Sequence, residues 1–266
     1  MPRVFDFNRA IARAPSRSVV SGLRADNRGD PTYEGVLAEH RAYVAALESC
    51  GVNVTVLPAL DAYPDSIFVE DPALVFTEGA IVLRPGAPSR FGESAEMAPS
   101  LRKIFSAVHE LPAPGYADGG DILVTPRSVM IGLSARTDET GGKALIAILA
   151  KMGKAAELVR TPPGFLHFKS DCSLLDEETV FSTRRLAASG VFGGLKVLHV
   201  PVGEEGAANA LRINNTVLLS NAYPRSADVL LKAGYHVRTM ATDEIAKIDA
   251  GLSCMSLRWW DAGAPT

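Results

Sequence analysis

Three residues with reactive side chains stand at the starts of three separate strand-like segments. Asp118 begins the segment DGGDILV, His167 begins HFKSDCS, and Cys254 lies in GLSCMSLRW, which opens the last such segment. A carboxylate, an imidazole and a thiol are the groups that nucleophilic thiol catalysis combines as orienting acid, general base and nucleophile. If the fold brings these strand starts to one point, the sequence predicts a catalytic site there.

A cluster of acidic residues precedes the first of these segments. Asp65, Glu70 and Asp71 surround the apolar Ile67–Val69, and no lysine or arginine stands among them. Acids that are brought together without cationic partners repel one another and are costly to desolvate. A cationic ligand would relieve that cost, so acids beside a thiol indicate a site for a positively charged carbon electrophile such as a guanidinium.

Each of these residue types also has a purely structural interpretation. Free cysteine is among the most buried residue types, which fits Cys50 near a helix end and Cys172 in a hairpin strand. Cys254 differs because it follows Gly251 at a strand start, where the backbone can approach a ligand closely. The Asp-Gly-Gly sequence at 118–120 is also a common turn signal.

The five histidines of the chain do not occupy equivalent positions. His167 alone opens a predicted inner strand. His40 lies in the middle of a predicted helix beside charged neighbours, where we expect it to be solvated. The other three lie in predicted outer strands, where a structural role is favoured: His109, His199 and His236.

The elements that must position these residues recur five times along the chain. Five short apolar runs of alternating character are typical of strands, and a helix-like segment precedes most of them. These predicted outer strands are 52–57, 107–111, 156–160, 196–200 and 235–239. The clearest predicted helices are 33–49, 93–105 and 142–152.

A loop and then a predicted hairpin follow each of the first four outer strands. The hairpin turns are at 77–79, 125–127, 176–178 and 214–215. The fifth unit has only the strand-like segment 252–260, so we expect the N-terminal residues 3–8 to supply the missing strand and close a ring. Units of roughly 40–50 residues with one helix and about three strands predict a five-bladed α/β propeller.

A closed ring would place the start of every inner strand around one central channel. The residues at these starts are 65–71, Asp118, His167, Asn209 and Cys254. We expect residues 1–266 to form one catalytic domain of this kind. An ordinary open α/β sheet is the alternative, and its nucleotide-binding form is disfavoured because no glycine-rich phosphate loop follows the first strand.

Composition narrows the classes of function. The formal net charge of −3 gives no basic surface for nucleic acid, and no apolar run approaches the length of a membrane span. The N-terminus has no signal-peptide core, and three widely spaced cysteines suit the reducing cytoplasm. Because no zinc-ligand spacing is present, we expect no metal and no cofactor. A small-molecule substrate and a homodimer are the expected partners.

In combination, these motifs resemble the guanidino-group modifying enzymes of the pentein fold, and among them most closely the dimethylarginine dimethylaminohydrolase family. The likeness rests on DSIFVED at 65–71, DGGD at 118–121, GLSART at 132–137, HFKS at 167–170 and GLSCMSLR at 251–258. It extends over essentially the whole chain. The resemblance implies hydrolysis of Nω-methylated arginines to citrulline and a methylamine, without a cofactor.

The resemblance also implies a role for each site residue. Cys254 would attack the guanidinium carbon, His167 would protonate the departing amine and then activate water, and Asp118 would orient the imidazole. The resemblance also implies the substrate contacts. Asp71 would bind the guanidinium, and Asp65 and the carbonyl near Leu23 would bind the α-ammonium. Arg90 and Arg136 would bind the α-carboxylate, and Glu70 and the carbonyl of Ile248 are implied as further contacts.

The chain departs from its relatives at two positions. Asp118 stands where relatives often have a glutamate. Arginine deiminases and amidinotransferases carry a His-x-Asp motif, whereas this chain has a lysine at 169. One carboxylate fewer leaves room for a methylated nitrogen, which favours methylarginine over arginine. The alternative functions are an arginine deiminase-like or other guanidine hydrolase, and a non-catalytic pentein that binds a macromolecule.

Overall fold

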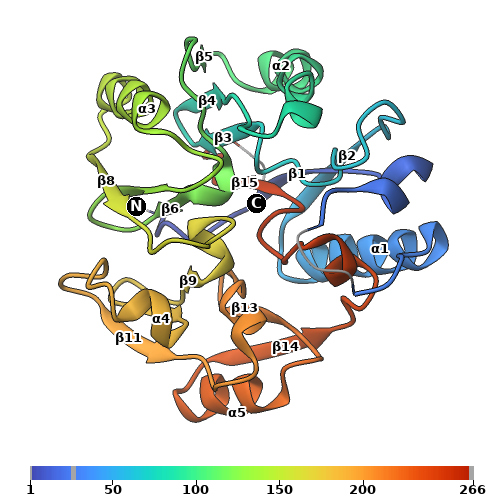
Figure 1. The fold of residues 1–266 in the computed structure, drawn as a ribbon, viewed down its shortest axis with the longest axis vertical. Helices are drawn as coiled ribbons and strands as arrows, with labels where there is room; N and C mark the ends of the chain where they lie inside the picture. The colour runs from blue at the N-terminus through green and yellow to red at the C-terminus, as the bar shows by residue number, and fades with distance from the viewer. Residues whose placement is uncertain (1, 25–27, 264–266) are drawn as a thin grey trace.

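Five three-stranded sheets surround a common axis in the computed structural model, which describes residues 2–24 and 28–263. The helices lie on the outside of the ring, and the chain passes once around it from blue to red (Figure 1). The predicted five-bladed α/β propeller is confirmed.

Every sheet has the same internal order. Strands β3 (Ala73–Phe76) and β4 (Gly79–Val82) form an antiparallel hairpin, and β5 (Val108–Glu110) pairs in parallel with β4. Helix α2 (Glu93–Ile104) lies between the two parallel strands in the sequence, as a parallel connection requires. The inner strand of the hairpin therefore runs beside the axis, and the helix and outer strand form the rim.

The next three sheets repeat this arrangement. Their strands are β6 (Ile122–Val124), β7 (Val129–Leu133), β8 (Ala156–Arg160), β9 (Cys172–Leu174), β10 (Thr179–Ser182), β11 (Lys196–His199), β12 (Leu211–Ile213), β13 (Thr216–Ser220) and β14 (His236–Met240). Their helices are α3 (Glu139–Lys151), α4 (Arg184–Ala187) and α5 (Pro224–Lys232). The four predicted turns and the predicted outer strands are confirmed. No helix of the described residues is long and apolar enough to cross a bilayer.

The fifth sheet joins the two ends of the chain. Strand β15 (Leu257–Trp259) is innermost, β1 (Arg9–Arg13) pairs antiparallel with it, and β2 (Asn53–Leu57) pairs in parallel with β1. Helix α1 (Tyr33–Ser49) connects the two parallel strands. The prediction that the N-terminal region closes the ring is confirmed, because β1 supplies the middle strand of this sheet.

The predicted position of that strand, 3–8, was wrong. Residues at the start of this stretch form a turn, in which the Asp6 N–H donates to the Arg3 carbonyl at 3.0 Å. The Asp6 carboxylate also pairs with the Arg3 guanidinium at 2.8 Å. This local ion pair holds a bent backbone, so the extended strand begins only at Arg9.

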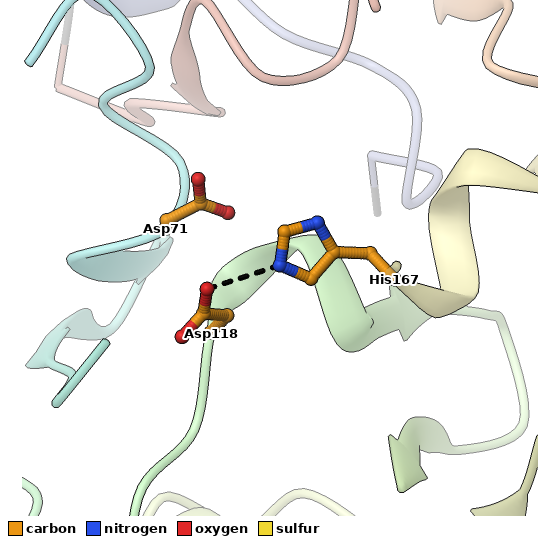
Figure 2. A group of neighbouring side chains, drawn as sticks. All are labelled: Asp71, Asp118 and His167. Carbon is orange, nitrogen blue, oxygen red and sulfur yellow. Dashed lines mark hydrogen bonds and ion pairs between the residues drawn. The ribbon is translucent and has the colours of Figure 1, made fainter. Parts of the chain in front are cut away.

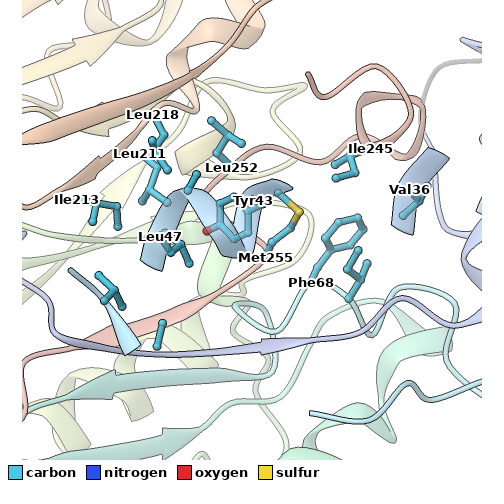
Figure 3. Close-up of a cluster of buried hydrophobic side chains, with 14 of the residues drawn as sticks. Val36, Tyr43, Leu47, Phe68, Leu211, Ile213, Leu218, Ile245, Leu252 and Met255 are labelled. Carbon is cyan, nitrogen blue, oxygen red and sulfur yellow. The ribbon is translucent and has the colours of Figure 1, made fainter. Parts of the chain in front are cut away.

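The core cluster beneath α1 fixes the segment that contains Cys254. Tyr43 and Leu47 of α1 pack against Phe68 and Met255 (Figure 3). The Tyr43 hydroxyl also shares a hydrogen bond of 2.6 Å with the Ser256 hydroxyl. Because Met255 is fully buried directly after the cysteine, packing in this cluster sets the position of the thiol-bearing loop.

The same helix buries His40, so the expectation of a solvated histidine was wrong. His40 is only 3% exposed and lies on the helix face that also carries Val36, Tyr43 and Leu47. These positions are four, three and four residues apart, which is the spacing of one buried helical face. Burial lowers the pKa of His40 to about 4, so the ring is neutral at physiological pH.

Candidate active site

The residues predicted to form the site lie just before the inner strands, at one end of the ring. In each case a short turn separates the side chain from its strand. The pairs are Asp71 before β3, Asp118 before β6, His167 before β9, Asn209 before β12 and Cys254 before β15. Figure 2 shows that Asp71, Asp118 and His167 point toward one another, and they come from the loops that precede three different sheets.

His167 and Asp118 form a hydrogen-bonded pair. The His167 Nε2 lies 3.0 Å from Asp118 Oδ2, and the other oxygen of this fully buried carboxylate accepts the Gly86 N–H at 2.6 Å. Burial opposes the charged imidazole, but the Asp118 hydrogen bond and the charges of Asp71 and Asp121 raise the pKa of His167 to about 9. The imidazole is therefore protonated at neutral pH and can serve as a general acid.

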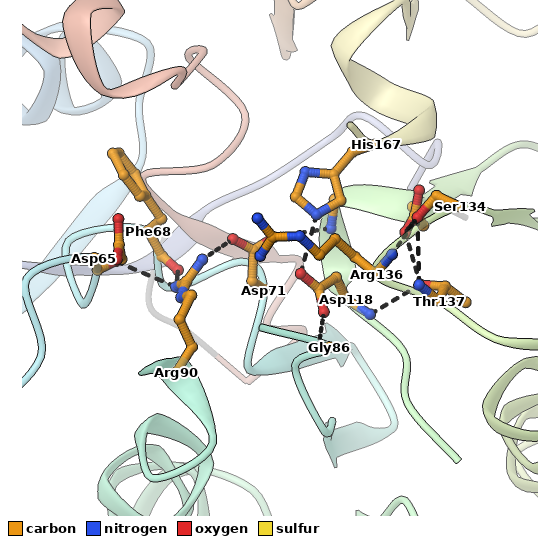
Figure 4. Close-up of polar contacts among 12 residues, drawn as sticks. Asp65, Phe68, Asp71, Gly86, Arg90, Asp118, Ser134, Arg136, Thr137 and His167 are labelled. Carbon is orange, nitrogen blue, oxygen red and sulfur yellow. Dashed lines mark hydrogen bonds and ion pairs between the residues drawn. The ribbon is translucent and has the colours of Figure 1, made fainter. Parts of the chain in front are cut away.

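Asp121 ties three segments of the site together, although it was not a predicted site residue. Its Oδ1 accepts the Phe168 N–H at 2.8 Å, and its Oδ2 accepts the Ser134 and Thr137 hydroxyls at 2.7 Å each. The Thr137 oxygen in turn accepts the Asp118 N–H at 3.0 Å (Figure 4). Burial raises the pKa of Asp121 to about 6, against the effect of these donors.

We call the hydrogen bonds of Asp121 to these three segments the Asp121 clamp. The two glycines of the DGGD motif are the feature of the sequence that indicates it. A Cβ on Gly120 would lie 2.8 Å from the His167 ring and 3.0 Å from Asp71 Oδ1. The Gly120 N–H donates to that same oxygen at 3.1 Å. Because no side chain fits between the imidazole and the carboxylate, this position requires glycine.

Cys254 is held by its backbone and by its neighbour. The Ser253 N–H donates to Asn209 Oδ1 at 3.0 Å, and the Asn209 amide donates to the Lys169 carbonyl at 3.0 Å. The Glu70 N–H donates to the Cys254 carbonyl at 3.1 Å. Within the described residues no hydrogen bond joins the Cys254 thiol to an imidazole.

The substrate-free thiol is neutral. Burial, followed by the nearby carboxylates of Glu70 and Asp71, raises the pKa of Cys254 to about 11. Cys172 is buried as predicted, and burial raises the pKa of its thiol also. Cys50 is only partly buried, so its predicted place in the core is only partly correct.

The inference that the acidic cluster lacks cationic partners was wrong for Glu70. Lys169 Nζ lies 2.5 Å from Glu70 Oε1, and Arg258 Nη2 donates to the same oxygen at 3.2 Å. The second oxygen accepts the Ser253 hydroxyl at 3.0 Å. The partners come from distant segments, so Glu70 braces the thiol-bearing loop as part of a salt-bridge cluster that we call the Glu70 cluster (Glu70, Lys169 and Arg258).

Asp71 also has a cationic partner, Arg90. The buried Arg90 guanidinium forms ion pairs with Asp71 and with Glu93, the second at 2.6 Å. It also donates hydrogen bonds to the carbonyls of Asp65 and Phe68, at 3.2 and 3.0 Å (Figure 4). Although burial opposes ionisation, Arg90 lowers the pKa of Asp71. The contact of Arg90 with a substrate carboxylate stays a prediction, and it requires these bonds to be exchanged.

Arg136 occupies a different environment from Arg90. It is half-buried, and its side chain points toward Asp71 and His167 in Figure 4. Its loop is fixed because the Arg136 N–H donates to the Ser134 hydroxyl at 2.9 Å. The side chain therefore reaches the site from a rigid base.

Three further predicted contact residues lie together at the edge of the site. Asp65 Oδ1 accepts the Leu23 N–H at 2.9 Å. A Cβ on Gly22 would lie 3.1 Å from Asp65 Oδ1 and 3.4 Å from the Ile248 side chain. The structure thus brings Leu23, Asp65 and Ile248 to one place, around a carboxylate whose pKa burial raises.

Asp71, Asp118 and His167 also have the composition of a metal site. One ligand atom of each lies within 4.8 Å of the others (Figure 2). Two carboxylates and an imidazole suit several divalent ions. In this structure the imidazole is bound to Asp118 and Asp71 is bound to Arg90, so a metal would have to displace both interactions.

Comparison with known proteins places this arrangement in a family. Residues 2–149 match a family model described as N,N dimethylarginine dimethylhydrolase, eukaryotic. The chain is 37% identical over 254 residues to N(G),N(G)-dimethylarginine dimethylaminohydrolase of Pseudomonas aeruginosa. This alignment covers 95% of this chain and 100% of the relative. It is 30% identical to the Streptomyces coelicolor protein of the same name, over 94% and 96% of the two chains.

Solved structures agree with the sequence relatives. A cysteine-to-serine variant of the P. aeruginosa enzyme complexed with citrulline has a TM-score of 0.92 and 37% identity, over 96% of this chain and 100% of that chain. The N-terminal domain of ArgZ, an arginine dihydrolase from cyanobacteria, shares the fold with a TM-score of 0.83 and 18% identity, over 94% and 96%. The chain therefore belongs to the dimethylarginine dimethylaminohydrolase family, as its motifs had predicted.

Proposed function

We propose that this chain hydrolyses asymmetric dimethylarginine and monomethylarginine to citrulline and dimethylamine or methylamine. The observation that carries the proposal is the 3.0 Å His167–Asp118 pair beside the acidic segment that leads to Asp71. Support also comes from relatives that are named for this activity. Side chains supply the acid, the base and the nucleophile, so the proposed reaction needs no cofactor.

The first half of the proposed reaction forms a covalent intermediate. Cys254 releases its proton to solvent when the guanidinium binds, because the substrate cation offsets the carboxylates that keep the thiol neutral. The sulfur attacks the guanidinium carbon, and the bond from this carbon to the methylated nitrogen breaks. His167 gives its proton to the leaving amine, and a thiouronium remains on the cysteine.

The second half reverses the role of the imidazole. Neutral His167 takes a proton from water, and the oxygen attacks the thiouronium carbon. The carbon–sulfur bond then breaks, citrulline leaves, and the departing sulfur recovers a proton. Asp118 keeps the ring oriented throughout and stabilises the imidazolium, as the acid of a catalytic triad does.

The proposed substrate contacts lie around the His167–Asp118 pair and at the edge of the site. We propose that Asp71 holds the guanidinium and that Asp65 holds the α-ammonium, next to the backbone of Leu23 and Ile248. Arg136 is the better supported partner of the α-carboxylate, because the donors of Arg90 are already bound to acids and carbonyls. Glu70 acts indirectly in this scheme, by bracing the loop that carries the thiol.

Parallel assays with asymmetric dimethylarginine and arginine test this function. We expect citrulline and dimethylamine in equal amounts from the first substrate and little citrulline from the second. Citrulline mainly from arginine would favour the alternative, an arginine deiminase-like hydrolase. Absence of citrulline from both substrates would contradict the proposal, provided that the preparation unfolds cooperatively on heating.

We also propose one catalytic domain over residues 1–266, a cytoplasmic location and a homodimeric assembly. All three cysteines are free, which supports a reducing compartment. Light scattering after size-exclusion chromatography checks the assembly, and a monomeric mass at micromolar concentration would contradict the homodimer.

A further inference from the structure

A cavity of about 540 Å³ lies on the ring axis behind the site, and we call it the rear cavity. Its walls follow the five inner strands from their starts toward the hairpin turns. Its inner end is formed by Glu70, Lys169 and Ser253, which adjoin the site. Its outer end is formed by residues 3–7 and by the turns at 77–78 and 125–128.

The rear cavity has more cationic than acidic side chains among the described residues that line it. The cations are Arg3, Arg127, Lys154, Lys169, Arg212 and Arg258, and the acids are Asp6, Glu70 and Glu78. Each acid is already paired: Asp6 with Arg3 at 2.8 Å, Glu78 with Lys154 at 3.0 Å, and Glu70 within the Glu70 cluster. The lining therefore has an excess of positive charge.

Two arginines account for most of the excess, and the remainder comes from Lys169 and Arg258, which share Glu70. Within the described parts of the chain, no carboxylate oxygen lies within 4.0 Å of the guanidinium of Arg127 or Arg212. Arg212 Nε donates to the Asn214 carbonyl at 2.7 Å, and this bond fixes the direction of the side chain. Neither terminal nitrogen of Arg212 makes a hydrogen bond within those residues. A guanidinium whose Nε is hydrogen-bonded and whose two terminal nitrogens are available is suited to bind an oxyanion through two parallel hydrogen bonds.

The surroundings of Arg212 strengthen the need for an anion. Its guanidinium lies over the Phe5 ring at 5.3 Å and the Tyr235 ring at 5.8 Å, and the Arg3 guanidinium lies over the same Phe5 ring at 4.7 Å. Burial and then the charge of Arg3 lower the pKa of Arg212, whereas Tyr235, Asp176 and Asp6 act in the opposite direction. Asp6, which pairs with Arg3, offsets part of the repulsion between the two arginines, and an anion bound at Arg212 would offset more of it.

We propose that the rear cavity binds a small anion that carries two or more carboxylate or phosphate groups. The two terminal nitrogens of Arg212 receive one group, and Arg127, which lines the same cavity from the turn between β6 and β7, receives another. The apolar walls, which include Phe76 and Trp259, contact the carbon skeleton. The volume lies within the range of small-ligand sites. This site is separate from the proposed reaction and does not depend on it.

Calorimetric titration with citrate and, separately, pyrophosphate tests the proposal at constant ionic strength set with sodium chloride. We expect saturable binding of at least one probe, and the probe that binds identifies the preferred group. Arg212→Gln should weaken binding by about tenfold or more, because it removes a charge-assisted hydrogen-bonded pair. Arg127→Gln, which leaves the Asn214 turn intact, should weaken binding as well.

Two control variants separate the rear cavity from other cationic surfaces. Arg41→Gln removes an exposed charge from α1, outside the cavity, and should leave the affinity unchanged. Arg136→Gln removes a charge from the front site and should also leave it unchanged. A cavity that holds only water would give no saturable heat with either probe. That result, or equal weakening by Arg41→Gln and Arg212→Gln, would overturn the proposal.

Discussion

The two ends of the inner strands carry opposite charge. The front end, formed by the residues before the strands, gathers Asp71, Asp118 and Asp121 around His167, with Asp65 at its edge. The rear cavity, formed along the strands and at their hairpin turns, contains Arg127 and Arg212, which have no carboxylate partner among the residues that the structure describes. The Glu70 cluster lies between the two ends and contacts both. One repeated scaffold thus supports two electrostatically opposite sites, because the loops at each end differ.

The two ends also satisfy their charges differently. At the front, each of the four buried acids has a partner that shifts its protonation or fixes its position: Arg90 for Asp71, His167 for Asp118, two hydroxyls for Asp121, and the Leu23 N–H for Asp65. At the rear, arginines stack on aromatic rings. The front is therefore organised to hold a cation and transfer a proton, and the rear is organised to attract an anion.

The largest expected effect comes from removing the nucleophile at the front end. Cys254→Ser should lower kcat by roughly 10⁵-fold, because an alcohol in this site is a far poorer nucleophile than a thiolate. The variant should keep the thermal unfolding transition of the parent chain. Cys50→Ser is the matched control, and its turnover should not change. Loss of the transition in the first variant would mean that the thiol is a packing residue.

Asp118→Asn should lower kcat by about 10²- to 10⁴-fold, because the imidazole loses its orientation and its charge partner. The pH profile gives a second readout. Because the pKa of His167 is raised to about 9, the folded protein keeps this proton up to about that pH. The stability that the His167–Asp118 pair provides is fully present below the unfolded value near 6.5, and it is lost as pH rises through about 9. Activity of the parent chain should fall above about pH 9, and that limb should move to lower pH in the variant. An unmoved limb would assign the ionisation to another group.

Lys169→Met tests the cluster that separates the two ends. Glu70 would keep only Arg258 as a cationic partner, so the free energy of unfolding should fall by about 2 kcal/mol. Denaturant unfolding measures the change. Lys143→Met is the control, because its ion pair with Glu139 is exposed and should contribute less than about 0.5 kcal/mol. Equal losses in the two variants would contradict a structural role for the buried pair.

The smallest expected effect belongs to the rear cavity. Arg212→Gln should leave the steady-state turnover of dimethylarginine within about twofold of the parent value in a buffer without multivalent anions. The reason is that Arg212 contacts the Asn214 turn and two aromatic rings, and none of the proposed catalytic groups. A tenfold loss of kcat with an unchanged unfolding transition would show that the two ends are coupled.

The fold could be predicted because its signals are local. Each outer strand, helix and hairpin turn has a pattern in its own residues, and the repeat of these patterns indicates the ring. The exception is β1, which was predicted at 3–8 but lies at Arg9–Arg13. The Arg3–Asp6 turn occupies the predicted stretch, and this ion pair has no strong pattern in the sequence.

The site could be predicted only in part, because its partners come from distant segments. The starts of the inner strands indicated Asp118, His167 and Cys254. Nothing near Glu70 in the sequence indicates that Lys169 and Arg258 would neutralise it, since they lie 99 and 188 residues away in the chain. The clamp by Asp121 was missed for a related reason: its carboxylate resembles a turn residue until its three donors are known.

Mass spectrometry of acid-quenched turnover mixtures tests whether the covalent chemistry at the front end takes place on Cys254. With dimethylarginine as substrate, we expect the peptide that contains Cys254 to gain the mass of the substrate less dimethylamine. The peptides containing Cys50 and Cys172 should remain unmodified. Steady citrulline release with no adduct on Cys254, or with the adduct on another cysteine, would show that Cys254 is not the nucleophile.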